Sequence, residues 1–261
     1  MLDLALLGLG AAFFGLVEAA VVFYLRAFLD PGGTRFPLVE LPPLILSVEL
    51  WREFATLVLL VCFAALAVRG AVARLAAFLV AFGIWDLAYY AALRLIMHWP
   101  ASWTDWDILF LLPVLWMGPV YAPVLVSMTM IGTGLAALAH SARYDAFRVQ
   151  ARHLLGAALG ALAVVASFVR PGVALQSGAL PERYPVELLL LGEAIGLAAF
   201  ADAWRRNRAR TRAHLSATSA PGSARARPSS PAPPGAAPSS SAGAPTSTGS
   251  APRAPQPPEA N

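Results

Sequence analysis

The sequence contains no lysine, and all 19 of its basic residues are arginine. This absence excludes proteins that hold a substrate or cofactor through a lysine Schiff base, retinal proteins among them, and nucleotide sites of the Walker type. The chain has a single cysteine, Cys62. A disulfide, a thiol redox pair or a cysteine-rich metal site within one chain is therefore excluded as well.

Charged residues are also scarce, at 13% of the chain, whereas hydrophobic residues reach 58%. Several apolar runs in residues 1–203 reach the roughly 20 residues that a membrane-spanning helix needs. The core of a soluble protein would not require so many such runs. We predict an all-α, polytopic membrane helix bundle with about six transmembrane helices, of which the fourth is broken by prolines. The expected spans are Leu4–Leu25, Ser47–Val68, Val72–Met97, the broken segment Ile108–Ala139, Leu154–Val169 and Pro185–Ala203.

Two polar segments follow the apolar part of the chain. Residues 204–215 contain the run "WRRNRARTRAH" and form a basic juxtamembrane segment, which contributes to a pI of about 9.7. Arginines at this position favour anionic lipid headgroups, so the expected partner is the lipid bilayer and not nucleic acid. Residues 216–261 are rich in Pro, Ser and Ala and cannot bury a core, which predicts a disordered tail.

The arginines also predict an orientation. They occur in the links after the second and fourth spans and after the last span, whereas the Trp-rich link after the third span has none. The positive-inside rule then places both termini in the cytoplasm of a bacterial-type inner (plasma) membrane. The N-terminus lacks a basic region, so we expect the first run to be a retained helix and not a cleaved signal peptide.

Small residues recur at helical spacing in three spans. Gly156 and Gly160 in the fifth span, and Gly192 and Gly196 in the sixth, each form a G-x-x-x-G pattern that permits close backbone approach. We therefore predict close packing of these two spans. A similar stripe on the first span consists of Ala11, Gly15 and Ala19. Such faces leave a homo- or hetero-oligomer open.

Ionisable side chains inside apolar runs are costly, which makes each one a candidate for function. At ~1.5 Å rise per residue, Glu18, Glu53, Asp86 and Glu193 all fall in the outer half of the bilayer or near its middle. This common depth predicts an outward-facing polar site. The candidate ligand-binding residues are Glu18, Glu49, Arg52, Glu53, Asp86, Tyr90, Arg94 and Glu193.

The candidates in the second and third spans each follow one helix face. Those of the second span are Glu49, Arg52 and Glu53, and those of the third are Asp86, Tyr90 and Arg94. One arginine can pair with two carboxylates. The acids outnumber the arginines, and pairing alone does not explain the excess. A purely structural network of acids and arginines nevertheless stays open.

No cofactor is predicted, and the catalytic residues, if there are any, are not identified by any motif. His140 and His153 flank the polar run "SARYDAFRVQAR", which is a poor setting for haem between two histidines. An H-x-x-x-H pattern is absent from the sequence. A metal ion and haem stay open alternatives.

The segment Asp107–Pro123 is apolar but contains three prolines. Thr104 and Asp107 match a capping box, which predicts that a helix starts there. We expect Pro113 in the first turns of a short outer half-helix or re-entrant arm. The break should then fall at Gly118-Pro119, with Pro123 in the first turn of a second helix.

Residues 84–126 contain the words "WDLAYY", "WDILFLLP" and "GPVYAP". This block resembles one found in a family of uncharacterised bacterial multi-pass inner-membrane proteins. It covers about a sixth of the chain. No activity is assigned to that family, so the resemblance implies an integral membrane protein and no particular ligand or catalytic residue.

Three functions fit these observations. The first is the binding or transport of a proton, a cation or a small polar ligand at the outward-facing acidic and arginine-containing site, and a discontinuous fourth span favours it. The second is a membrane-embedded accessory or assembly subunit without a ligand of its own. The third is an enzyme that acts on a lipid-soluble substrate, with an acid such as Asp86 or Glu193 as general acid–base.

Overall fold

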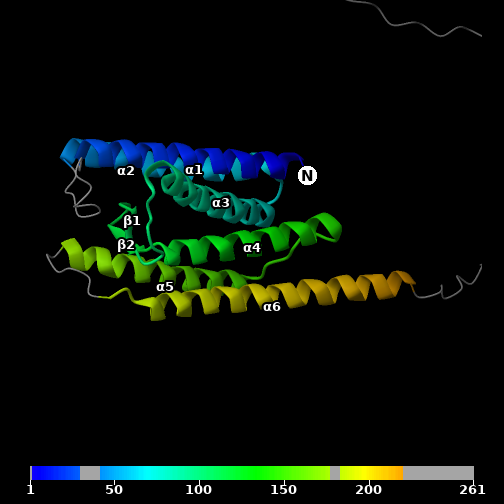
Figure 1. Ribbon diagram of the computed structural model, residues 1–261. Helices are drawn as coiled ribbons and strands as arrows, with labels where there is room; N and C mark the ends of the chain where they lie inside the picture. Colours follow the sequence, from blue (N-terminus) through cyan, green and yellow to red (C-terminus); the bar gives the residue numbers. More distant parts are fainter. Residues whose placement is uncertain (1, 30–41, 177–182, 220–261) are drawn as a thin grey trace, which may run out of the picture. The chain divides into compact units, whose positions relative to one another are not determined.

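The computed structural model describes residues 2–29, 42–176 and 183–219. Within these residues the chain forms six helices and one two-stranded hairpin (Figure 1). The helices are α1 (Leu2–Leu29), α2 (Pro43–Ala67), α3 (Ala71–Met97), α4 (Tyr121–Arg143), α5 (Ala151–Gln176) and α6 (Val186–Ser219), and the strands are β1 (Trp106–Phe110) and β2 (Trp116–Pro119). The predicted helix bundle is confirmed.

Helices α1 to α5 are each long and apolar enough to cross a membrane. Helix α6 carries Glu187, Glu193 and Asp202 in its first half and does not meet the same criterion. It continues without interruption through the basic juxtamembrane segment, so residue 203 is not a helix end. Residues 216–219 of the predicted tail belong to α6, and the rest of that tail lies outside the described residues.

Helix α3 lies at the centre of one group of helices, in contact with α1, α2 and α4, while α5 and α6 pack against each other. Consecutive helices run in opposite directions (Figure 1). The β-hairpin lies where α1 and α3 end and α4 begins. We call this the hairpin end of the bundle.

Glycines permit the closest helix contacts. A Cβ atom on Gly15 of α1 would lie 2.3 Å from the Trp85 carbonyl oxygen of α3. A Cβ on Gly160 would lie 2.7 Å from the Gly192 carbonyl oxygen and 2.8 Å from the Gly196 nitrogen. No side chain fits at such distances, so the predicted close packing of the fifth and sixth spans is confirmed. These small-residue faces are used inside the chain.

The predicted half-helix before the fourth span is wrong, because the segment forms a β-hairpin. Strands β1 and β2 are antiparallel, with Asp107 opposite Gly118. Aromatic and β-branched residues in "WDILF" favour an extended strand, and Pro113 cannot continue a helix. Antiparallel pairing satisfies part of the hairpin's backbone groups, and irregular backbone at membrane depth must be buried in protein or line a water-filled cavity.

The roles of the individual break residues also differ from the expectation. Gly118 lies in β2, where a Cβ atom would come within 2.9 Å of the Phe168 ring, so this glycine serves close packing and is not a helix break. Pro119 is the last residue of β2. Pro123 lies in the first turn of α4, as predicted.

Two contacts attach the hairpin to α2 and α5. The Glu53 carboxylate of α2 accepts hydrogen bonds from the Leu111 N–H at 2.9 and 3.0 Å and from the Leu112 N–H at 3.2 Å. On the other side, a Cβ atom on Gly172 of α5 would lie 1.9 Å from the Leu115 carbonyl oxygen. The hairpin is therefore held between α2 and α5.

Candidate functional site: a cavity with one polar end

A cavity of about 540 Å³ extends through the bundle. Its lining comes from all six helices and from the hairpin, and runs along α3 from Val72 to Tyr90. Most lining side chains are apolar, including Phe78, Leu79, Phe82, Val164, Leu197 and Phe200. Ionisable side chains line it mainly at the hairpin end, which gives the cavity one polar end.

The first polar group joins α1 to α2. The Arg52 Nε donates to Glu49 Oε2 at 2.7 Å, and the Arg52 guanidinium also pairs with Glu18. Both carboxylates are buried, with residue exposures of 8% for Glu18 and 5% for Glu49. One arginine thus neutralises part of the charge of two acids; the helix face of the second span indicated Glu49 but not Glu18 as its partner.

The second polar group connects the hairpin to α1 and α3. Asp107, only 1% exposed, pairs with Arg26 at 3.6 Å and accepts hydrogen bonds from the Tyr90 hydroxyl at 3.1 Å and the Tyr89 hydroxyl at 3.4 Å. The Arg26 guanidinium lies 3.9 Å from the centroid of the Trp99 ring. Burial raises the pKa of the Asp107 carboxyl to about 6, although Arg26 acts to lower it. At neutral pH the carboxyl is therefore ionised and attracts the guanidinium.

Asp107 and Arg26 were not among the predicted site residues. The capping box assigned Asp107 to a helix start, which is wrong because the residue lies in β1. In this link the Asp105 carboxylate accepts hydrogen bonds from the backbone N–H groups of Ala101 and Ser102, at 2.8 and 3.1 Å. An arginine in the last turn of an apolar span was the one available signal for Arg26.

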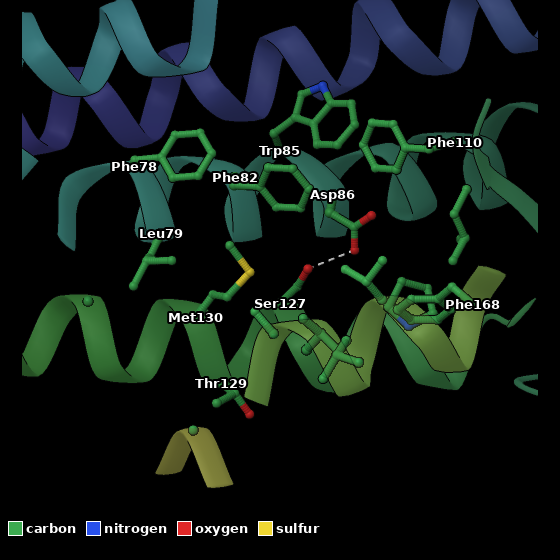
Figure 2. Close-up of a pocket in the computed structure, with 18 of the residues that line it drawn as sticks. Phe78, Leu79, Phe82, Trp85, Asp86, Phe110, Ser127, Thr129, Met130 and Phe168 are labelled. Atoms are coloured by element: carbon green, nitrogen blue, oxygen red, sulfur yellow. Dashed lines mark hydrogen bonds between the residues drawn. The ribbon is translucent and has the colours of Figure 1, made fainter. Parts of the chain in front are cut away.

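Asp86 lies on the cavity wall in a different environment (Figure 2). It is 8% exposed, and its Oδ2 accepts one hydrogen bond from the Ser127 hydroxyl of α4 at 2.8 Å. Within the described ranges, no arginine or histidine lies within ion-pair distance of this carboxylate. Phe82, Trp85 and Phe110 line the cavity together with Asp86.

Glu193 brings a second carboxylate to the same cavity from α6. The side chain is half-buried and hydrogen-bonds with Thr129 of α4. Its Oε2 is buried, and no hydrogen-bond partner for this atom is found in the part of the chain that the structure describes. Asp86 of α3 and Glu193 of α6 thus both contact α4, through Ser127 and Thr129.

Seven of the eight predicted site residues line this cavity. They are Glu18, Glu49, Arg52, Glu53, Asp86, Tyr90 and Glu193. The exception is Arg94, which is exposed, donates to the His98 carbonyl oxygen and lies outside the cavity lining. The expected stripe of the third span therefore holds for Asp86 and Tyr90 but not for Arg94.

His140 and His153, the two histidines that flank the polar run after the fourth span, both contact other side chains. His153 Nε2 lies 3.0 Å from Asp202 Oδ2, and its Nδ1 accepts the Gln150 N–H at 3.1 Å. His140 packs against the rings of Phe147 and Trp204. In residues 2–29, 42–176 and 183–219, no three His, Cys, Asp or Glu side chains are grouped so that they could hold a metal ion.

No model of a known protein family matches the chain, and no curated protein or solved structure matches it either. The cavity and its side chains are therefore the features from which a function can be inferred.

Proposed function

We propose that the protein binds an amphiphilic molecule that is dissolved in the membrane. The polar end of this ligand lies at the hairpin end of the cavity, and its apolar part lies along α3 and α5. One observation carries the proposal, namely a single cavity with apolar walls along most of its length and ionisable groups at one end. Its volume of about 540 Å³ falls within the usual range for small-molecule sites.

Access from the bilayer fits the exposure of the cavity walls. Leu75 of α3 and Leu154 of α5 both line the cavity and are 48% and 52% exposed. The cavity lining thus reaches the surface of the bundle at these two helices, which are apolar enough to be surrounded by lipid. The hairpin covers the polar end, where Glu53 and the Leu115 carbonyl attach it to α2 and α5.

The cavity favours this function over the accessory-subunit alternative. The Arg52 and Arg26 networks join α1, α2, α3 and the hairpin, and that role requires no internal space. Protein interiors are normally close-packed, so a cavity of this size needs an occupant. An enzyme acting on a lipid-soluble substrate would use the same cavity, with Asp86 as its acid–base group. A binding protein and an enzyme would both have to bind the membrane-dissolved molecule in this cavity.

The test uses a substitution that fills the cavity. Gly196 lines the cavity, and a Cβ atom added there would meet no atom within 4 Å. Gly196→Phe therefore places a ring in the open space. Gly132 is the matched control, because it is also a helical glycine with open space around its Cβ but does not line the cavity.

Native mass spectrometry of the protein released from mild detergent, together with chromatography of the extracted lipids, measures the bound molecule. We expect wild type and Gly132→Phe to retain an amphiphile that Gly196→Phe loses, with at least about a tenfold fall in occupancy, equivalent to 1.4 kcal/mol. Equal occupancy in the two variants, or a wild type that retains nothing, would show that the cavity is not the binding site.

A further inference from the structure

We infer that the polar end of this ligand is an organic cation and that the Asp86 carboxylate is its counter-charge. The inference rests on the proposed function, because it names the chemical class of the ligand for the same cavity. It depends on three features of the site: the unmatched charge of Asp86, the aromatic rings beside it, and the scarcity of oxygen atoms that a metal ion would need.

The other acids at the hairpin end already have partners. Glu18 and Glu49 share Arg52, Asp107 pairs with Arg26, and Glu53 accepts backbone N–H groups of the hairpin. Asp86 differs, since the structure assigns it only the Ser127 hydroxyl as a hydrogen-bond donor. Among the described residues, Asp86 therefore has neither the arginine that Glu18, Glu49 and Asp107 have nor the backbone N–H donors that Glu53 has.

A buried carboxylate without a counter-charge is unfavourable, because one neutral hydrogen bond replaces only part of its hydration. A ligand cation in the cavity would supply the missing charge. An anionic headgroup would instead face both Asp86 and Glu193, two carboxylates that line the same space. The negative charge of these two carboxylates therefore disfavours phosphate and carboxylate groups and favours an ammonium or a similar cation.

The walls next to Asp86 are aromatic, which suits an organic cation. The rings of Phe82 and Trp85 lie 5.3 Å apart, and Phe110 lies 6.2 Å from Phe82 and 6.3 Å from Trp85, measured between centroids. Phe82 precedes Asp86 by one turn of α3, and Figure 2 labels the three rings and Asp86 in the same part of the cavity lining. Aromatic faces attract cations, and this attraction is stronger where water is excluded.

A bare metal ion fits the same place poorly. Hard cations such as Ca²⁺ or Mg²⁺ require about six oxygen ligands. Asp86 and Ser127 supply carboxylate and hydroxyl oxygens, while Phe82, Trp85 and Phe110 supply none from their side chains. A cation whose charge is shared with an apolar body uses the carboxylate and the rings together. The inferred ligand class is thus a lipophilic amine or quaternary ammonium compound.

The test compares two probes of similar shape, the cation tetraphenylphosphonium and the neutral hydrocarbon tetraphenylmethane. Equilibrium binding of each radiolabelled probe is measured on the full chain in phosphatidylcholine nanodiscs, with empty nanodiscs subtracted. The proteins are wild type, Asp86→Asn and the matched control Glu187→Gln, whose acid is exposed at the start of α6 and lies outside the cavity lining. Asn keeps the shape of Asp86 and an oxygen that can accept the Ser127 hydrogen bond.

We expect wild type and Glu187→Gln to bind the cation at least tenfold more tightly than the hydrocarbon. Asp86→Asn should lose this preference while its affinity for tetraphenylmethane stays unchanged. Equal affinity of wild type for the two probes overturns the inference. This comparison uses wild type alone, so it remains valid even if Asp86→Asn folds poorly. An unchanged preference in Asp86→Asn overturns it too. Failure of both probes to bind wild type would instead reject the proposed function.

Discussion

Replacement of Arg52 by glutamine should destabilise the protein strongly, because it leaves two buried carboxylates without their shared cation. Glu18 and Glu49 are 8% and 5% exposed, and both pair with Arg52. Removing one partner of a buried ion pair costs about 3–5 kcal/mol. The Arg52 side chain is 22% exposed, so solvent relieves part of this cost and we expect a loss near the lower limit, about 3 kcal/mol.

The assay is thermal unfolding in a mild detergent, followed by intrinsic tryptophan fluorescence. For a protein of this size each kcal/mol shifts Tm by about 2–4 °C, so Arg52→Gln should lower Tm by about 6–12 °C. Arg94→Gln is the matched control, since Arg94 is exposed and donates only to a carbonyl oxygen, and surface changes are usually within about 0.5 kcal/mol. Equal shifts for the two variants would refute the reasoning. So would an Arg52→Gln protein as stable as wild type.

Two further predictions concern the hairpin. Gly172→Ala should lower stability by about 1–3 kcal/mol, because its Cβ would lie 1.9 Å from the Leu115 carbonyl oxygen. Gly132→Ala, where a Cβ meets nothing within 4 Å, should leave Tm unchanged or raised, and the opposite order of the two Tm values would contradict the packing. Glu53→Gln should accelerate hydrogen–deuterium exchange in the peptide that contains Leu111 by about tenfold, since the amide replaces one accepting oxygen with a donor. Exchange at the wild-type rate would mean that Glu53 does not hold the hairpin.

The bundle was predictable because its signals are local. The apolar runs of α1 to α5 are long enough to define spanning helices, and Pro123 fits the first turn of α4 as its missing N–H requires. The G-x-x-x-G patterns that contain Gly160 and Gly192 predicted the close approach of α5 and α6. The depth of Glu18 and Asp86 along their helices likewise predicted that both would reach the same part of the bundle.

The hairpin and its ion pair were not predictable in the same way. A short apolar run such as Trp106–Phe110 fits a strand or a helix segment equally well, and periodicity does not separate the two. The pairing of Arg26 with Asp107 joins distant parts of the chain, so no local spacing encodes it. Arg94 shows a limit of the helix-face argument, because eight residues after Asp86 a helix has turned about 80° beyond two complete turns. That rotation is enough to move a side chain from the cavity to the surface.

The central claim is that the cavity holds a membrane-dissolved molecule with its cationic end at Asp86. An electron cryo-microscopy map of the wild-type protein in a nanodisc of native lipids tests this most directly. We expect elongated non-protein density between α3 and α5, with one end against the Asp86 carboxylate and the rings of Phe82 and Trp85. A cavity closed by direct packing of α5 against α3, or density whose polar end lies away from Asp86, would contradict it.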